Sequence, residues 1–154
     1  MTRARTLVVP CMLVAVCLAL PCAAAQGASV AKAASASQMV QRINAFRAHH
    51  HLRALHSSST LSRQSSHQSR WMIQRDVFAH SAQGSMYGFR SLGECIALTV
   101  GRRQVGTTLR NWRNSPTHRA VLLHGGFNRI GIAATKGRFR GRTVTIWVAR
   151  LGTK

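Results

Sequence analysis

Acidic side chains are so rare in this chain that each one is a candidate for a specific task. Of the 154 residues, 22 are lysine or arginine, and only Asp76 and Glu94 are acidic. Glu94 lies in the stretch SLGECIALTV, at the head of an apolar run. An unpartnered carboxylate beside apolar residues is costly, so we expect Glu94 to have a defined role.

Two other groups of potentially reactive side chains have simpler interpretations. Cys95 follows Glu94 directly, but no signature of a cysteine nucleophile surrounds it, and we interpret it as a small buried thiol. The tract HHH at 49–51 has the composition of a metal-binding run. Adjacent residues at a helix end point in different directions, so we expect a solvated helix end there.

The first 25 residues form a separate segment. MTRAR is basic, the following run is apolar, and Ala23 and Ala25 offer a cleavage site, which predicts a secretory signal peptide over 1–25. An uncleaved membrane anchor is the alternative, because residues 7–25 are just long enough to cross a thin bilayer. Cleavage would leave Cys95 alone, so the exported domain would contain no internal disulfide.

The mature chain begins with a small, polar stretch at 26–36, which we interpret as a flexible linker. After it, Met39, Ile43 and Phe46 share one helical face, and Arg47 lies outside that stripe. The pattern predicts a first helix that starts after a cap at Ser37.

Three further helices are predicted. The second begins near Ser58 or Ser59, and the third lies in RQVGTTLRNW at 103–112. The fourth lies in NSPTHRAVLLHGG, with Ser115 as its cap, Pro116 in its first turn and Gly125 at its end. The glycine- and aromatic-containing stretch at 75–94 is expected to be a long ordered loop.

The C-terminal part changes period. FNRIGIAAT and RTVTIWVARLG are β-rich runs separated by the basic stretch KGRFRG, which predicts an antiparallel hairpin. Helices first and an antiparallel pair last indicate a single α+β domain over 37–154 with a layered core.

Five motifs follow one another in a fixed order: INAFRAHHHLRAL, VFAHS, GECIAL, NWRNSPTHRAVLL and FNRIGIA. Together they resemble the CAP superfamily of cysteine-rich secretory proteins, antigen 5 and pathogenesis-related proteins, and above all its small bacterial secreted branch. The resemblance covers residues 37–152, with Cys95 where the family usually has asparagine. It implies a three-layer α-β-α sandwich with a cleft lined by two histidines and up to two acids.

Matched motif by motif, the cleft residues implied by this resemblance are His80, Glu94 and His118. The second acid is absent. Asn114 and Ser115 lie where animal and plant members tend to carry it, and bacterial members often have Asn-Ser there. Glu94 is therefore the single acidic residue expected in the cleft.

Two imidazoles and a carboxylate suffice to bind Zn²⁺ or another divalent cation, with water in the fourth position. His118 would lie in the first turn of a helix begun at Pro116, where the helix dipole disfavours the imidazolium. Three interpretations stay open: a satisfied polar network that braces the long loop, a cation site formed by His80, Glu94 and His118, or a hydrolytic site in which Glu94 activates water.

The formal net charge of +20 favours anionic partners. The export signal and the lack of an aromatic-basic strand motif argue against nucleic acid. We expect a secreted or cell-envelope-associated monomer that binds ligands and an anionic envelope polymer or lipid, with Asn114, Ser115 and Arg119 as candidate binding residues. The alternative is a metal-assisted hydrolase acting on a cell-wall polymer, peptide or lipid, which the missing second acid weakens.

Overall fold

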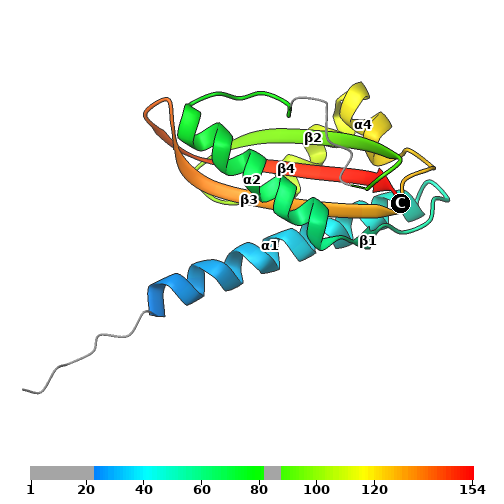
Figure 1. Cartoon of the computed structure of the whole chain (residues 1–154), viewed down its shortest axis with the longest axis horizontal. Helices are drawn as coiled ribbons and strands as arrows, with labels where there is room; N and C mark the ends of the chain where they lie inside the picture. The colour runs from blue at the N-terminus through cyan, green and yellow to red at the C-terminus, as the bar shows by residue number, and fades with distance from the viewer. Residues whose placement is uncertain (1–22, 82–87) are drawn as a thin grey trace, which may run out of the picture.

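The computed structural model describes residues 23–81 and 88–154 (Figure 1). Most of the predicted signal peptide lies outside these residues, so its cleavage stays a prediction. None of the described helices combines the length and apolarity needed to cross a membrane. The elements in chain order are α1 (Ala23–Ala48), β1 (His56–Ser57), α2 (Ser59–Arg75), β2 (Ser91–Val100), α3 (Val105–Asn114), α4 (Pro116–Leu122), β3 (Arg129–Phe139) and β4 (Arg142–Thr153).

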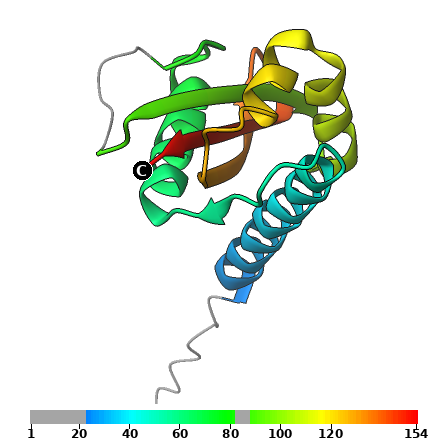
Figure 2. The same ribbon diagram turned by 90° about the vertical axis from the view of Figure 1, so that its right-hand side faces the viewer.

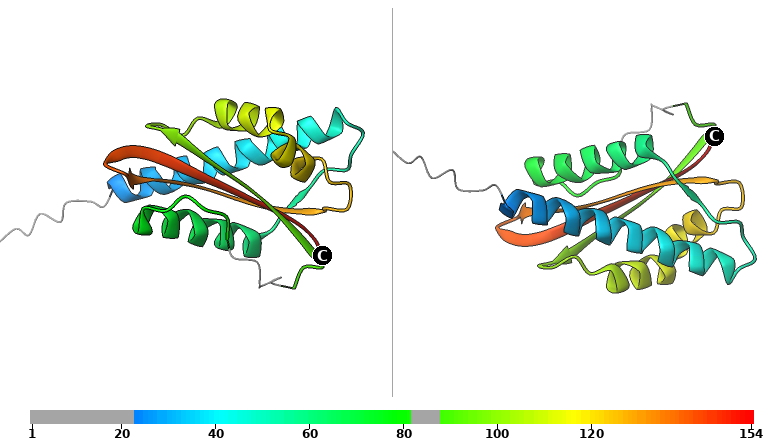
Figure 3. Two further views of the ribbon diagram at one scale, coloured as in Figure 1. Left: turned by 90° about the horizontal axis from the view of Figure 1, so that it is seen from above. Right: turned by 90° about the horizontal axis from the view of Figure 1, so that it is seen from below.

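The strands form one mixed sheet in the order β1-β3-β4-β2. The short strand β1 runs parallel to β3, and the β2–β4 and β3–β4 pairs are antiparallel. Helix α2 covers one face of the sheet, and α1, α3 and α4 lie over the other (Figures 2 and 3). The arrangement confirms the predicted three-layer α-β-α sandwich with a C-terminal antiparallel hairpin.

Each face of the sheet has its own apolar core. The core under α2 contains Met72 and the β4 residues Ile146 and Val148. The larger core under the other three helices contains Trp112 from α3 and Trp147 from β4. Successive side chains of a strand point to opposite faces, so a strand covered on both sides is apolar almost throughout.

Helix α1 differs most from its prediction. It starts at Ala23 instead of after Ser37, so the stretch 26–36, interpreted as a flexible linker, is helical. The physical reason is composition, because alanine, the best helix former, dominates this segment. The apolar stripe of Met39 and Ile43 is fully buried, as predicted.

Arg47 lies inside the protein, which corrects the expectation that it lies outside the buried face of α1. Its guanidinium donates hydrogen bonds to four backbone carbonyls, those of Arg53 (3.0 Å), Leu122 (2.8 Å), His124 (3.1 Å) and Phe127 (3.3 Å). Burial lowers the pKa of Arg47, but guanidinium groups stay protonated in proteins. The side chain thus joins the end of α1 to the segment that follows α4.

Helix α2 begins as predicted, with Ser58 as its cap and the Ser58 hydroxyl accepting a hydrogen bond from the Leu61 amide. It ends at Arg75, and the next residue, Asp76, caps it in a left-handed conformation with φ of 54°. The Asp76 carboxylate accepts a 2.6 Å hydrogen bond from the Arg140 amide. Since Arg140 and Gly141 both have positive φ and connect β3 to β4, this acid fixes a two-residue hairpin turn.

Strand β2 is an element that the sequence patterns did not predict, because its first four residues read as the end of a loop. It spans ten residues and pairs along its whole length with β4, which places Glu94 opposite Arg150. Gly93 permits a close approach of α4 and the following segment. A Cβ atom there would lie 2.8 Å from the Val121 side chain and 2.9 Å from Phe127.

Helices α3 and α4 form close to where they are predicted. Ser115 precedes α4, and Pro116 occupies its first turn. The helix ends at Leu122, three residues before the glycine at 125 that was expected to end it. The Trp112 indole N–H donates to the Ile96 carbonyl at 3.1 Å, which ties α3 to the middle of β2.

Candidate functional site

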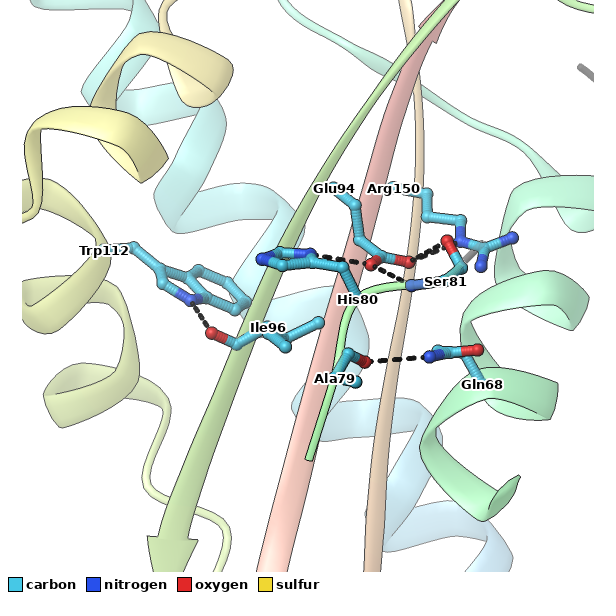
Figure 4. A network of polar contacts seen from close by, with 8 residues as sticks. All are labelled: Gln68, Ala79, His80, Ser81, Glu94, Ile96, Trp112 and Arg150. Carbon is cyan, nitrogen blue, oxygen red and sulfur yellow. Dashed lines mark hydrogen bonds and ion pairs between the residues drawn. The ribbon is translucent and has the colours of Figure 1, made fainter. Parts of the chain in front are cut away.

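The Glu94 carboxylate is the centre of a polar network between β2, β4 and the segment after α2 (Figure 4). One oxygen, Oε1, accepts from His80 Nδ1 at 2.9 Å and from the Ser81 amide at 3.0 Å. The other, Oε2, accepts from Ser81 Oγ and from Arg150 Nε, each at 3.0 Å. Both oxygens are therefore occupied by donors of the protein itself.

These donors decide the charge of Glu94. Burial raises the pKa of this carboxyl, but the Ser81 amide, His80 and the positive charge of Arg150 together outweigh burial and hold its pKa below the ordinary value. The side chains of Glu94 and Arg150 are only 12% and 7% exposed, so the ion pair is poorly screened by solvent. Glu94 is thus an ionised, weakly basic carboxylate.

Two strands and one loop build this network. Glu94 and Arg150 are cross-strand partners in the β2–β4 ladder, so the sheet register brings them together. The loop that carries residues 80–81 is held by α2, because Gln68 Nε2 donates to the Ala79 carbonyl at 3.0 Å. Glu94 in turn attaches that loop to the edge strand of the sheet.

His80 has one nitrogen left for a ligand. A carboxylate only accepts hydrogen bonds, so the Nδ1 atom that contacts Glu94 must carry the proton. In the neutral ring, Nε2 then holds the free lone pair, and within the described part of the chain it has no hydrogen-bond partner. The His80 side chain is 58% exposed, so this nitrogen is accessible from solvent.

His118 lies beside His80 in the first turn of α4. The two ring centroids are 6.5 Å apart, with planes inclined by 36°. The His118 Nδ1 atom contacts Ser115 Oγ at 2.9 Å. Burial first, and then electrostatic repulsion from the neighbouring His80 imidazole, lower the pKa of His118, so this ring is neutral at neutral pH.

The predicted residues come together only in part. His80 and Glu94 are in direct contact, and His118 is the neighbour of His80. Over residues 23–81 and 88–154, however, no three histidine, cysteine or acidic side chains are grouped closely enough to hold a metal ion. The chemistry of the donor set fits two imidazole ligands oriented by a carboxylate better than three direct ligands.

The three predicted binding residues do not share one site in the structure. Ser115 belongs to the site through His118. Asn114 is the exposed last residue of α3, and among the described residues it forms no hydrogen bond with the network. Arg119, half-buried on α4, donates to His50 at 3.3 Å, away from Glu94.

Cys95 is a buried thiol, as predicted. Its sulfur contacts the His118 carbonyl oxygen at 3.7 Å, which joins β2 to α4. Burial, followed by the charge of Glu94, raises the pKa of Cys95 well above its ordinary range. A thiol with a raised pKa is a poor nucleophile, so Cys95 acts here by packing.

Sequence reasoning missed two members of the network, Ser81 and Arg150. Arg150 carried a usable signal, because an arginine inside the apolar run of the last strand needs an acceptor, and the chain offers only two acids. Ser81 follows His80 directly in VFAHS, but no sequence pattern marks its two hydrogen bonds to Glu94.

Comparison of the sequence with known proteins identifies one family. The sequence profile of the cysteine-rich secretory protein family, CAP, matches residues 40–150. A search of curated proteins finds no significant match.

Solved structures show the same fold. An extracellular protein of Bacillus anthracis that contains an SCP domain superposes with a TM-score of 0.65 and 22% identity, over 80% of this chain and 41% of that one. An outer surface protein of Borrelia burgdorferi superposes with a TM-score of 0.64 and 17% identity, over 77% of this chain and 91% of that one. A cysteine-rich secretory protein of Staphylococcus aureus superposes with a TM-score of 0.54 and 14% identity, over 80% of this chain and 39% of that one. These likenesses concern the fold.

Proposed function

Because this chain belongs to the cysteine-rich secretory protein (CAP) family, we propose that it is a secreted binding module held at the cell envelope by its charge. The extracellular and outer-surface proteins that share its fold support secretion. The partner we propose is an anionic envelope polymer or lipid. The observation that carries the proposal is that both acidic residues are engaged in contacts inside the domain.

Both acids are used inside the domain. Glu94 accepts from Arg150 and from the loop at 80–81, and Asp76 accepts from the hairpin turn. Apart from Arg150, which pairs with Glu94, the 22 lysines and arginines of the chain have no acidic side chain left to neutralise them. Such an excess attracts polyanions over long range and raises the rate of encounter with them.

Exposed basic side chains occur on more than one layer of the domain. Arg70 is exposed on α2, and Arg110 is exposed on α3, on the opposite side of the sheet. Arg138 and Arg142 are exposed on the hairpin. This distribution supports attachment to an extended polyanion that contacts several faces, because one small ligand cannot reach them all.

Adsorption to matched polymers tests the proposal. The purified protein is applied to carboxymethylated cellulose and to unmodified cellulose at low salt. Retention on the anionic matrix alone is expected, because the two matrices differ only in charge. Equal retention on both matrices would contradict attachment by charge.

A second candidate function is divalent-cation binding, favoured by the neighbouring His80 and His118. Each ring uses Nδ1 within the protein, and no described residue contacts its Nε2 atom. These two Nε2 atoms would hold Zn²⁺ or a similar cation, with Glu94 orienting His80 through its proton. The cation, when bound, would supply Lewis acidity or a ligand anchor.

Metal content tests this second candidate. Purified protein is dialysed against trace zinc and compared with His118→Ala and with His67→Ala, a change of an exposed histidine on α2. The wild type and His67→Ala should retain zinc, and His118→Ala should lose it. Equal, negligible zinc in all three proteins would remove the cation site.

The hydrogen bonds and the ion pair of Glu94 disfavour the hydrolase alternative. A hydrolytic role would require Glu94 to take a proton from water, and its lowered pKa makes it a weak base. Two protein donors also occupy each of its oxygens. We therefore propose binding, with the carboxylate as a positioning group.

A further inference from the structure

Two arginine side chains, Arg113 from α3 and Arg119 from α4, meet over Phe46, at the C-terminal end of α1. The buried Phe46 ring lies under two guanidinium groups, with Arg113 Cζ at 4.5 Å and Arg119 Cζ at 5.2 Å from the ring centroid. His50 packs edge-on against the same ring, with centroids 4.9 Å apart. None of these four residues contacts Glu94, so the cluster is distinct from the site described above.

The cluster has no counter-charge within the chain. The only acids are Asp76 and Glu94, and both are engaged elsewhere. The two guanidinium carbons sit near one ring centroid and so lie within about 10 Å of each other. This upper bound is comparable to the Debye length of about 8 Å at physiological salt, so salt screens their repulsion only in part. An anion from outside the chain would relieve this repulsion.

The arginine donors are free to bind such an anion. A guanidinium that stacks on an aromatic face keeps its N–H donors along its edge. Within the described residues, Arg113 has no hydrogen-bond acceptor, and Arg119 donates only to His50. The position of two cations on one rigid aromatic platform reduces the conformational cost of binding.

We propose that Arg113, Arg119 and His50 form a binding site for a phosphate group. A phosphate group carries several strong acceptor oxygens, and a phosphate monoester has a charge of about −1.5 to −2 at neutral pH, which matches two guanidinium groups and one imidazole. Arginine also binds phosphate oxygens in a bidentate manner. A single carboxylate offers only two oxygens and one charge, so it fits this site less well. The inference does not depend on attachment to an envelope polymer.

Phosphate binding at this site is coupled to the protonation of His50. Arginine only donates, so the His50 Nε2 atom that contacts Arg119 must hold a lone pair, and the ring is neutral in this arrangement. Loss of some hydration, and then the charges of Arg119, His49, Arg113 and His51, lower the pKa of His50. A bound anion reverses the local field, so phosphate raises the pKa of His50.

The experiment follows the His50 imidazole by NMR while inorganic phosphate replaces chloride at constant ionic strength. We expect a saturable shift of the His50 resonances and a rise of its pKa. Replacement of Arg113 or Arg119 by glutamine should weaken phosphate binding about tenfold, the value of a charge-assisted hydrogen bond. The control is Arg70→Gln, which makes the same charge change on the opposite face of the sheet and should leave affinity unchanged.

Two results would overturn the site. One is the absence of a saturable His50 response to phosphate. The other is an equal loss of affinity in Arg70→Gln and Arg113→Gln, which would mean that only net charge matters. Circular dichroism of each variant confirms folding, and Arg113 is exposed, so its replacement leaves the core intact.

Further titrations, followed by the same His50 response, identify the source of the phosphate group. Dimethyl phosphate, a diester, is titrated beside inorganic phosphate, and a response to both admits phosphodiesters as ligands. A response to inorganic phosphate alone restricts the site to monoesters. Phosphatidylglycerol vesicles that compete for the same His50 response would identify a lipid headgroup, and vesicles that do not compete would leave soluble phosphates. Cellulose adsorption stays independent, because Arg113→Gln removes only one of 22 basic charges.

Discussion

Glu94→Gln removes the negative charge of the site with almost no change of shape. The carboxylate accepts four hydrogen bonds, one of them from Arg150, which is buried in β4. Loss of one partner from a buried ion pair costs about 3–5 kcal/mol. Glutamine keeps one carbonyl oxygen as an acceptor, so we expect the lower end of that range, about 3 kcal/mol.

The assay is urea unfolding followed by circular dichroism, at neutral pH and in the absence of metal. Since the free energy of unfolding of small proteins falls by about 1–3 kcal/mol per molar urea, a loss of about 3 kcal/mol lowers the urea midpoint by roughly 1–3 M. The matched control is Asp76→Asn, which changes the charge by the same amount at the only other acid. Asp76 is exposed, and asparagine keeps the oxygen that accepts from Arg140, so its cost should be small.

The pH dependence has a definite sign. The pKa of Glu94 in the folded protein is below its ordinary value of 4.5, so the stabilisation by its charge is complete at neutral pH and lost as pH falls through the lowered pKa. The stability difference between wild type and Glu94→Gln should therefore shrink in acid. A cost for Glu94→Gln no larger than that for Asp76→Asn would refute the role of Glu94 as the brace of this network.

Four further predictions concern other parts of the fold. Gly131→Ala should destabilise the domain by about 1–3 kcal/mol or prevent folding, because a Cβ there would lie 2.2 Å from backbone atoms of Leu61 and Ser62. Gly106→Ala, in the helix α3 with space around it, should be neutral or stabilising when measured in the same urea assay. Cys95 should react with a thiol reagent only after denaturation, and fast reaction of the native protein would contradict its burial. Arg47→Met should unfold the domain more easily by about 1–3 kcal/mol, because buried carbonyl groups lose their donor, and an unchanged melting temperature would argue against that role.

The helices were predictable where local signals agree. Ser58 and Pro116 mark helix starts by chemistry that acts within a few residues, and both predictions hold. The start of α1 was missed because small residues at 26–36 are compatible with either a linker or a helix. Arg47 was misplaced because its partners lie as far as Phe127, which no local pattern can reveal.

The site was predictable only in outline. Resemblance to a family supplied His80, Glu94 and His118, and the structure brings them into one neighbourhood. It could not supply Arg150, because the pairing of Glu94 with Arg150 depends on the register of two strands far apart in sequence. Strand β2 itself was missed because its first four residues, 91–94, continue a glycine- and aromatic-containing stretch that has the composition of a loop.

The central claim, attachment to the envelope by charge, is tested most directly by the salt dependence of binding to a soluble polyanion. The affinity is measured from about 0.1 M to 1 M salt, over which the Debye length falls from about 10 Å to about 3 Å. We predict that affinity falls steeply and linearly on logarithmic axes, because each basic residue that engages the polyanion releases bound counterions. An affinity that stays unchanged between low and high salt would contradict the claim.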